Sequence, residues 1–186
     1  IELVKTLNPD SPKYNYFGFL KLHDNKLYTC NGKGWDFGEP ASIQIYDLDN
    51  NEWTTFENKS IEEKYGKKYK DIMTVDVDPM DSKHLFAGNQ MGLFEFYDGE
   101  LTQRWYDKNS PIYSHYNVSP GNENYQVITS IKYDNECNLW IINTGSSNST
   151  LLKLSKDRSW IIPGNAIEAE KADYMKFMGF DSKGYL

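Results

Sequence analysis

The sequence predicts an all-β fold, a partial β-propeller of about three four-stranded antiparallel blades with the start of a fourth. Three observations predict it. Short strands with alternating apolar residues recur along the chain, and an Asp-led turn follows the first strand of each group. The turn aspartates lie 54, 56 and 47 residues apart, at Asp24, Asp78, Asp134 and Asp181. A repeat of about 50 residues is typical of one propeller blade, whose four strands are joined by hairpins.

Each complete blade is predicted to hold four strands. The expected strands are 17–22, 26–30, 42–46 and 52–56 in the first blade (residues 16–56); 73–77, 84–88, 93–96 and 101–105 in the second (72–106); and 128–133, 138–142, 151–154 and 159–162 in the third (127–162). Asp-Gly and Asp-Asn pairs at the joints favour tight hairpins, because these residues accept positive φ or bond their own backbone.

The fourth stretch, residues 174–186, is predicted to begin a further blade, with a strand over 174–180 before the Asp181 turn. Its last residues read like a hairpin cut within the second strand. The opening residues, Ile1–Val4, show neither an initiator Met nor the pattern of a signal peptide. We therefore expect a segment of a longer protein.

Helix is sparse in this sequence. The best candidate is residues 60–69, where Ser60 and Glu63 match a capping box and Ile61, Tyr65 and Tyr69 share one face. Gly66 weakens this prediction. A shorter run over 166–172 is the other candidate.

Composition excludes several classes of protein. The 186 residues suit one domain or part of a larger one, and the net charge of −7 with no basic cluster argues against binding to nucleic acid or to an anionic membrane. The mean hydropathy is −0.71, and no apolar run approaches the ~18 residues of a spanning helix.

The two cysteines, Cys30 and Cys137, do not have the spacing of a metal site. Two free thiols are favoured over a disulfide.

A family resemblance lies in the third repeat, which reads Ile-Lys-Tyr-Asp-Asn-Glu-Cys-Asn-Leu-Trp-Ile over residues 131–141. It resembles the two-component-regulator propeller repeat, apolar-apolar-x-Asp-x-x-Gly-Asn-Leu-Trp-apolar, and residues 92–96 resemble the Gly-Leu strand that follows it. The resemblance implies a periplasmic sensor region of a hybrid two-component system in Bacteroidetes. A related propeller protein belongs to the type IX secretion machinery of that phylum, and residues 77–88, with their Asp-Pro turn, look more like that protein.

The resemblance spans roughly residues 16–186, with departures. Cys137 replaces the usual turn Gly, and Leu27-Tyr28 and Tyr185-Leu186 stand where the family has Leu-Trp. These repeats are therefore degenerate.

The long connections predict the binding surface. They are expected on one face of the disc, over residues 31–41, 57–71, 106–126 and 163–173. Loops on a rigid scaffold commonly carry binding residues. The candidate ligand-binding residues combine aromatic rings, which stack on sugars, with polar groups that bond hydroxyls: Trp35, Asp36, Tyr113, His115 and Tyr116. The competing interpretation is that Trp35 packs over a blade edge and the tyrosines pack within their loop. Four other tryptophans lie in strands and are expected to pack in the core or between blades: Trp53, Trp105, Trp140 and Trp160.

Few residues in the sequence suggest a catalytic site. His23, His84 and His115 form no metal or triad pattern, and the first two fall at turns on the opposite face. Carboxylates two apart, Asp47/Asp49 and Asp76/Asp78, are explained by local turn bonding. We therefore expect no enzyme activity, no catalytic residue, no metal and no cofactor.

The leading hypothesis is a non-catalytic, periplasmic or cell-surface sensing module of a two-component protein that recognises a glycan fragment. The alternative is a protein-interaction scaffold in type IX secretion, and a polysaccharide-active enzyme is a distant third. The expected partners are an oligosaccharide or a protein, with no nucleic acid and no membrane contact by this segment. Three blades and part of a fourth leave open sheet edges, so the remaining blades of its own chain or a second copy are also expected as partners.

Overall fold

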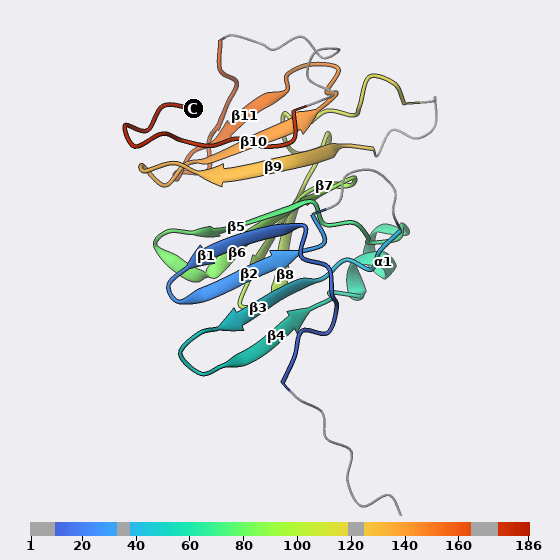
Figure 1. Cartoon of the computed structure of the whole chain (residues 1–186). Coiled ribbons are helices and arrows are strands. Elements are labelled where there is room, and N and C mark those ends of the chain that lie inside the picture. Colours follow the sequence, from blue (N-terminus) through green and yellow to red (C-terminus); the bar gives the residue numbers. More distant parts are fainter. Residues whose placement is uncertain (1–9, 33–37, 119–124, 165–174) are drawn as a thin grey trace, which may run out of the picture.

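The computed structural model describes residues 10–32, 38–118, 125–164 and 175–186. Within these ranges the chain forms three four-stranded antiparallel sheets, and each sheet is built from four consecutive strands (Figure 1). The prediction of an all-β, partial-propeller fold is confirmed.

The strands follow one another as hairpins within each blade. Blade 1 comprises β1 Phe19–His23, β2 Lys26–Cys30, β3 Ile43–Asp47 and β4 Glu52–Phe56; blade 2 comprises β5 Thr74–Asp78, β6 Asp81–Asn89, β7 Gly92–Tyr97 and β8 Glu100–Trp105; blade 3 comprises β9 Val127–Tyr133, β10 Leu139–Thr144, β11 Leu151–Leu154 and β12 Trp160–Ile161.

Blade 2 is the centre of the described fold, because it is covered on both faces. Every residue of β5 from Thr74 to Val77 and of β7 from Gly92 to Phe96 is buried. In β1, by contrast, half-buried residues alternate with exposed ones, and Leu20 and Leu22 are 56% and 64% exposed. Two hydrophobic clusters follow from this arrangement. One joins blades 1 and 2 through residues such as Tyr28, Ile43, Val75, Phe94 and Phe96, and the other joins blades 2 and 3 through Phe86, Leu93, Ile128, Ile131 and Leu139.

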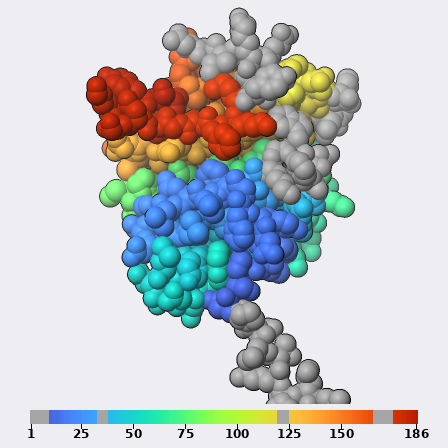
Figure 2. All heavy atoms as spheres, viewed as in Figure 1, coloured from blue at the N-terminus to red at the C-terminus, as the bar shows by residue number. Residues whose placement is uncertain are grey.

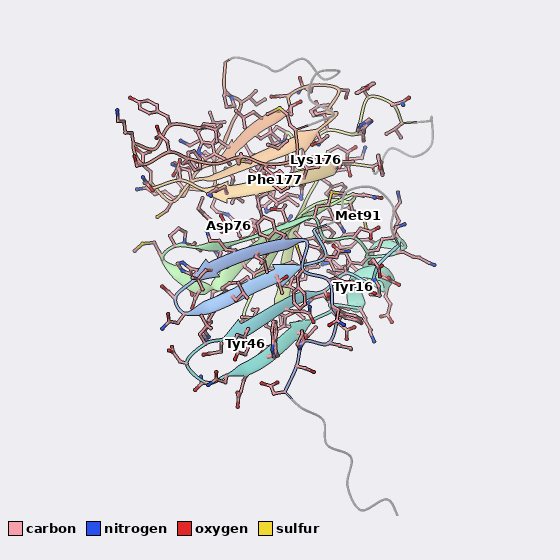
Figure 3. The ribbon with its side chains drawn as sticks, viewed as in Figure 1. Tyr16, Tyr46, Asp76, Met91, Lys176 and Phe177 are labelled. Carbon is pink, nitrogen blue, oxygen red and sulfur yellow. The ribbon has the colours of Figure 1, made fainter. Side chains whose placement is uncertain are left out.

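The first strands of the three blades are tied to one another by buried polar side chains of β5. Asp76, 2% exposed, lies 2.7 Å from Lys21 Nζ of blade 1 and accepts a 2.8 Å hydrogen bond from Tyr133 N of blade 3 (Figure 3). Thr74 Oγ1 accepts a further bond from Ile131 N. These bonds fix the register of each blade against the next.

The C-terminal segment, 175–186, lies across blade 3 (Figure 2). Ser130 Oγ accepts a hydrogen bond from Met178 N, as Thr74 accepts one from Ile131, so the segment takes the place of a fourth first strand. The predicted strand over 174–180 is nevertheless wrong for residues 175–180, because this segment is bonded to blade 3 through the side chains of Thr129 and Ser130 and not through a ladder of backbone bonds. Residue 174 lies outside the described ranges.

The Asp-led turns of the third and fourth repeats share one geometry. Asp134 N donates to Asn138 O and Asp181 N donates to Tyr185 O, both at 2.9 Å, and each carboxylate accepts backbone N–H groups of its own turn. Tyr185 is therefore the counterpart of Asn138. The sequence alignment that placed Tyr185-Leu186 over Leu-Trp is wrong by one residue, since Leu186 corresponds to Leu139.

The helix α1, Ser60–Tyr65, is shorter than the predicted span of 60–69. Gly66, with φ of 64°, ends it and donates its N–H to Glu62 O. The predicted capping box is also wrong: Lys59 is the N-cap, and no side chain caps the helix. The candidate helix over 166–172 lies outside the described residues. In the part of the chain that is described, no helix is long and apolar enough to cross a membrane.

Both cysteines are free thiols, with Cys30 buried and Cys137 half-buried. Cys137 occupies a strained position, because its φ is 62° and the equivalent residue of the fourth repeat is Gly184 at 83°. Burial raises the pKa of the Cys30 thiol to about 12, so Cys30 stays protonated.

Cys137→Gly is expected to stabilise the chain by about 0.5–1 kcal/mol, because a left-handed backbone costs glycine nothing. The measurement is urea unfolding followed by tryptophan fluorescence. Cys137→Ser removes the thiol but keeps Cβ, and it should leave the stability within about 0.5 kcal/mol of the parent. A glycine variant less stable than the serine variant would contradict this account.

Candidate functional site

The long connections gather on one side of the molecule, beside α1, while the tight hairpin turns lie on the other side (Figure 1). We call these sides the hairpin end and the long-loop face, whose described residues are 31–32, 38–42, 57–73, 106–118, 125–126 and 145–150. Backbone bonds link neighbouring long loops: Gly32 N donates to Ile72 O, and Tyr116 N donates to Gly145 O. Within 163–173, residues 165–173 lie outside the described ranges.

A buried carboxylate organises the first two long loops. Asp71 is fully buried, with φ of 52°, and it accepts bonds from Gly38 N at 3.0 Å and Glu39 N at 2.9 Å. These partners are backbone groups, so Asp71 shapes the loop. Two of the predicted site residues, Trp35 and Asp36, belong to the segment 33–37 that the structure does not describe.

The other three predicted site residues share one loop on the long-loop face. Tyr113 N donates to the buried Asn143 side chain at 2.8 Å, which anchors the loop to blade 3. The rings of His115 and Tyr116 stack with centroids 4.8 Å apart. Tyr113 and Tyr116 are each 43% exposed. The arrangement offers an aromatic surface, part of which is used in packing within the loop itself.

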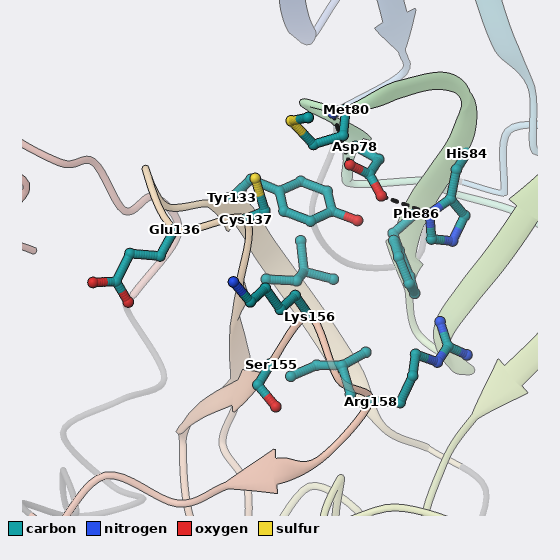
Figure 4. A pocket seen from close by; sticks show the side chains of 12 residues that line it. Asp78, Met80, His84, Phe86, Tyr133, Glu136, Cys137, Ser155, Lys156 and Arg158 are labelled. Atoms are coloured by element: carbon teal, nitrogen blue, oxygen red, sulfur yellow. Dashed lines mark hydrogen bonds and ion pairs between the residues drawn. The ribbon is translucent and has the colours of Figure 1, made fainter.

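Sequence reasoning missed the densest cluster of charged groups, at the hairpin end between blades 2 and 3. Glu95 of β7, 5% exposed, accepts hydrogen bonds from side chains of three other elements. His84 Nε2 lies 2.8 Å away, Trp105 Nε1 donates at 2.9 Å, and both terminal nitrogens of Arg158 donate, Nη2 at 2.7 Å. Asp78 completes the cluster, 3.0 Å from His84 Nδ1 (Figure 4).

The cluster is held by packing as well as by charge. The guanidinium of Arg158 lies 5.2 Å from the Trp105 ring centroid, and Trp105 meets Trp160 edge to face at 5.7 Å. Trp105 and Trp160 thus pack between blades, as predicted. The sequence signal for the cluster is a single carboxylate within the apolar run Leu93-Phe94-Glu95-Phe96, because an acidic residue is rarely buried without partners.

The protonation states follow from these contacts. Burial alone would raise the pKa of Glu95, but bonds from His84, Arg158 and Trp105 hold it at about 2. The bond to Glu95 raises the pKa of His84, and Asp78 adds to this effect. Both ring nitrogens of His84 face carboxylates, so the charged imidazolium fits and no ring nitrogen is left to act as a base. The cluster therefore joins blade 2 to blade 3 through Arg158.

The hydrogen bonds to His84 predict a pH dependence. A raised pKa means that the contribution of His84 to stability is complete below about pH 6.5 and is lost as pH rises through the folded-state pKa. We expect the melting temperature to fall between about pH 6 and pH 9, and to fall less in His84→Asn. Asparagine is the matched replacement, because Asn138 holds the equivalent place and bonds the turn aspartate Asp134. If the melting temperature falls equally with pH in the parent and in His84→Asn, the pH dependence does not come from His84.

The carboxylate pairs singled out in the sequence serve the fold. Asp47 accepts bonds from Asp49 N and Asn50 N within its own turn, while Asp76 and Asp78 serve different partners. Among the described residues, no group of three or more His, Cys, Asp or Glu side chains is placed to hold a metal ion.

Comparison with known proteins bears on this architecture. No protein-family model matches the sequence. No curated protein matches it either. A search of solved structures returns PorZ, described as an essential bacterial surface component of the type-IX secretion system of Porphyromonas gingivalis. This chain is similar to PorZ. The TM-score is 0.71 at 25% sequence identity, over 85% of this chain.

The match covers 21% of the PorZ chain, so this chain spans about a fifth of the length of PorZ. The likeness agrees with the β-propeller-like fold and with the resemblance of residues 77–88 to the secretion-machinery propeller. It lends no support to the two-component type of the repeat, to sensing or to glycan recognition, which stay predictions.

Proposed function

We propose that this chain is a non-catalytic, protein-binding part of a propeller within a surface component of a type IX secretion system. The single observation that carries the proposal is the likeness to PorZ, at a TM-score of 0.71 and 25% identity. It favours the scaffold over the sensor that the repeat motif first suggested. An extracytoplasmic location is part of the same proposal, since PorZ is a surface component.

A scaffold role also suits the chemistry of the described residues. Their most concentrated charged groups, around Glu95, bond one another across a blade interface. The carboxylates of the turns, such as Asp47 and Asp134, are bonded by backbone N–H groups. These charged groups therefore stabilise the fold, and the loops and exposed surfaces are left for contacts with a protein partner.

The test is made in the bacterium that encodes this chain. Deletion of the gene should leave cargo of the type IX system inside the cells, and the intact gene supplied in trans should restore its export. Biotinylation of whole cells with a membrane-impermeant reagent should label the protein. Normal export in the deletion strain would overturn the proposal.

Glycan binding remains the second candidate function, because Tyr113 and Tyr116 are exposed together on one loop. The test is an oligosaccharide array probed with the parent chain and with a Tyr113→Ala/Tyr116→Ala variant. A carbohydrate site there predicts a loss of binding of about tenfold in the variant, because two stacking contacts of about 0.5–1.5 kcal/mol each are removed and 1.4 kcal/mol is a factor of ten in affinity. No binding by the parent chain would remove this candidate.

A further inference from the structure

A cavity of about 320 Å³ lies at the hairpin end, between blades 2 and 3 (Figure 4). Its deeper lining is apolar: Phe86, Leu139 and Leu154 are at most 3% exposed. Exposed side chains lie around it, among them Glu136, Lys156 and Met80, which is 80% exposed. An apolar lining that opens beside exposed polar groups is typical of a pocket that receives one large side chain.

The cavity also contains an unused polar group. The Tyr133 hydroxyl has no hydrogen-bond partner within the described ranges, and it points into the space between blades 2 and 3 (Figure 4). Burial raises the pKa of Tyr133, and the nearby carboxylates Asp78 and Asp76 raise it further. The hydroxyl therefore stays neutral and can donate one bond to a carbonyl oxygen of an incoming chain.

Across the whole hairpin end, beyond the cavity itself, carboxylates outnumber cationic side chains. The carboxylates at its turns and adjoining strand ends are Asp24, Asp47, Asp49, Glu52, Asp78, Asp81, Asp98, Glu100, Asp134, Glu136, Asp157 and Asp181, and the cationic residues there are Lys26, Lys83, His84, Lys153, Lys156, Arg158 and Lys183. Bonds within the turns lower the pKa values of Asp47, Asp134 and Asp157, so these groups stay ionised in mildly acidic solution. Such a field attracts a basic partner and repels a copy of itself.

We propose that this cavity is a docking pocket for a basic polypeptide segment, which inserts one large apolar side chain between blades 2 and 3 and pairs flanking Lys or Arg residues with the acidic turns. Phe86, Leu139 and Leu154 contact the inserted side chain, and the Tyr133 hydroxyl bonds the backbone of the segment. Met80 closes over it at the mouth. The inference deepens the proposed scaffold function and rests on it for the choice of a protein partner.

The matching occupant is a protein segment and not a second copy bound face to face. Two copies that met through their hairpin ends would bring like charges together. The cavity also contains both signs of charge, with Lys156 and Arg158 near Asp78 and Glu136. The apolar side chain therefore supplies the specificity, while the wider acidic surface supplies attraction and a salt-dependent association rate.

Cys137 provides a built-in probe, because it lines the cavity and is half-buried, whereas Cys30 is fully buried. N-ethylmaleimide should modify Cys137 alone and fill part of the cavity. The test selects peptides of about 12 residues from a display library on the purified chain, and then measures their affinity for the unmodified and the modified protein. Cys137→Gly treated with the same reagent is the matched control.

We expect the selected peptides to carry Leu, Ile, Met or Phe with Lys or Arg nearby. Modification of Cys137 should weaken their binding about tenfold or more and leave binding to Cys137→Gly unchanged; Met80→Ala should weaken it several-fold. A bound peptide should slow the modification of Cys137. Acidic or wholly polar peptides, no selected peptide, equal affinity after modification, or a dimer broken by the reagent would each overturn the proposal.

Failure of this proposal can be told apart from failure of the scaffold function. Normal export in the deletion strain removes the secretion role and leaves the peptide affinities as measured. Blocked export together with no peptide binding at the cavity keeps the secretion role and removes this docking pocket.

Discussion

Glu95→Ala is expected to lower the free energy of unfolding by about 3 kcal/mol, the usual cost of removing one partner from a buried ion cluster. The substitution removes the acceptor for His84, Arg158 and Trp105 at once. Arg158 is half exposed and can return to water, which limits its share of the loss. The indole N–H of Trp105 and the imidazolium of His84 are more enclosed, so their lost bonds account for most of the cost.

The measurement is equilibrium urea unfolding at neutral pH. Glu100→Ala in β8 removes a carboxylate from the same blade at an exposed position, and it should change the stability by no more than about 0.5 kcal/mol. A double-mutant cycle between Glu95 and Arg158 should give a coupling energy of about 1–3 kcal/mol. If Glu95→Ala costs no more than Glu100→Ala, the cluster does not hold blades 2 and 3 together.

At acid pH the stability depends on Glu95, and it changes with pH in the opposite direction from the contribution of His84. Because the pKa of Glu95 is about 2 in the fold, against about 4.5 unfolded, its contribution is complete above that unfolded value and is lost as pH falls toward 2. The interface between blades 2 and 3 is therefore held best in the window between the unfolded pKa of Glu95 and the raised pKa of His84.

The blades were predictable because their signals are local. An alternating strand, an Asp-led turn and a second strand lie within about 20 residues, and a blade repeats this unit without crossovers. The side of the long loops followed from the same connectivity. The two wrong predictions for the helix also concern local signals. At the helix start, Lys59 took the N-cap and Gly66 ended the helix early, although the residue pattern favoured both a capping box and a longer span.

The Glu95 cluster could not be predicted, because its members meet across blades. Glu95 and Arg158 are 63 residues apart, and their contact depends on how two sheets pack. The cavity has the same origin, since its lining comes from β5, β6, β9, β10 and β11 and from the β5–β6, β9–β10 and β11–β12 turns. Sequence spacing predicts strands within one sheet; it carries little information on which side chains of one blade oppose those of the next.

Asp134→Ala is expected to lower the free energy of unfolding by about 2–3 kcal/mol, because several donors lose one acceptor. The carboxylate accepts backbone bonds from Glu136 and Asn138 and a 2.8 Å bond from Trp140 Nε1. Burial would raise the pKa of Asp134, yet bonds from Asn138 and Trp140 lower it. The aspartate thus joins the turn to the second strand of the blade, which gives a physical reason for Asp, Asn and Trp to occur together in this repeat.

The fourth repeat supplies the matched control for this prediction. Asp181 accepts the same two backbone bonds, from Lys183 N and Tyr185 N, but its turn is exposed and no tryptophan of the described ranges donates to it. Asp181→Ala should therefore cost less than about 1 kcal/mol in the same urea experiment. If the two substitutions cost the same, backbone bonding in the turn accounts for the whole effect, and the link from Asp134 to Trp140 adds nothing to the stability of blade 3.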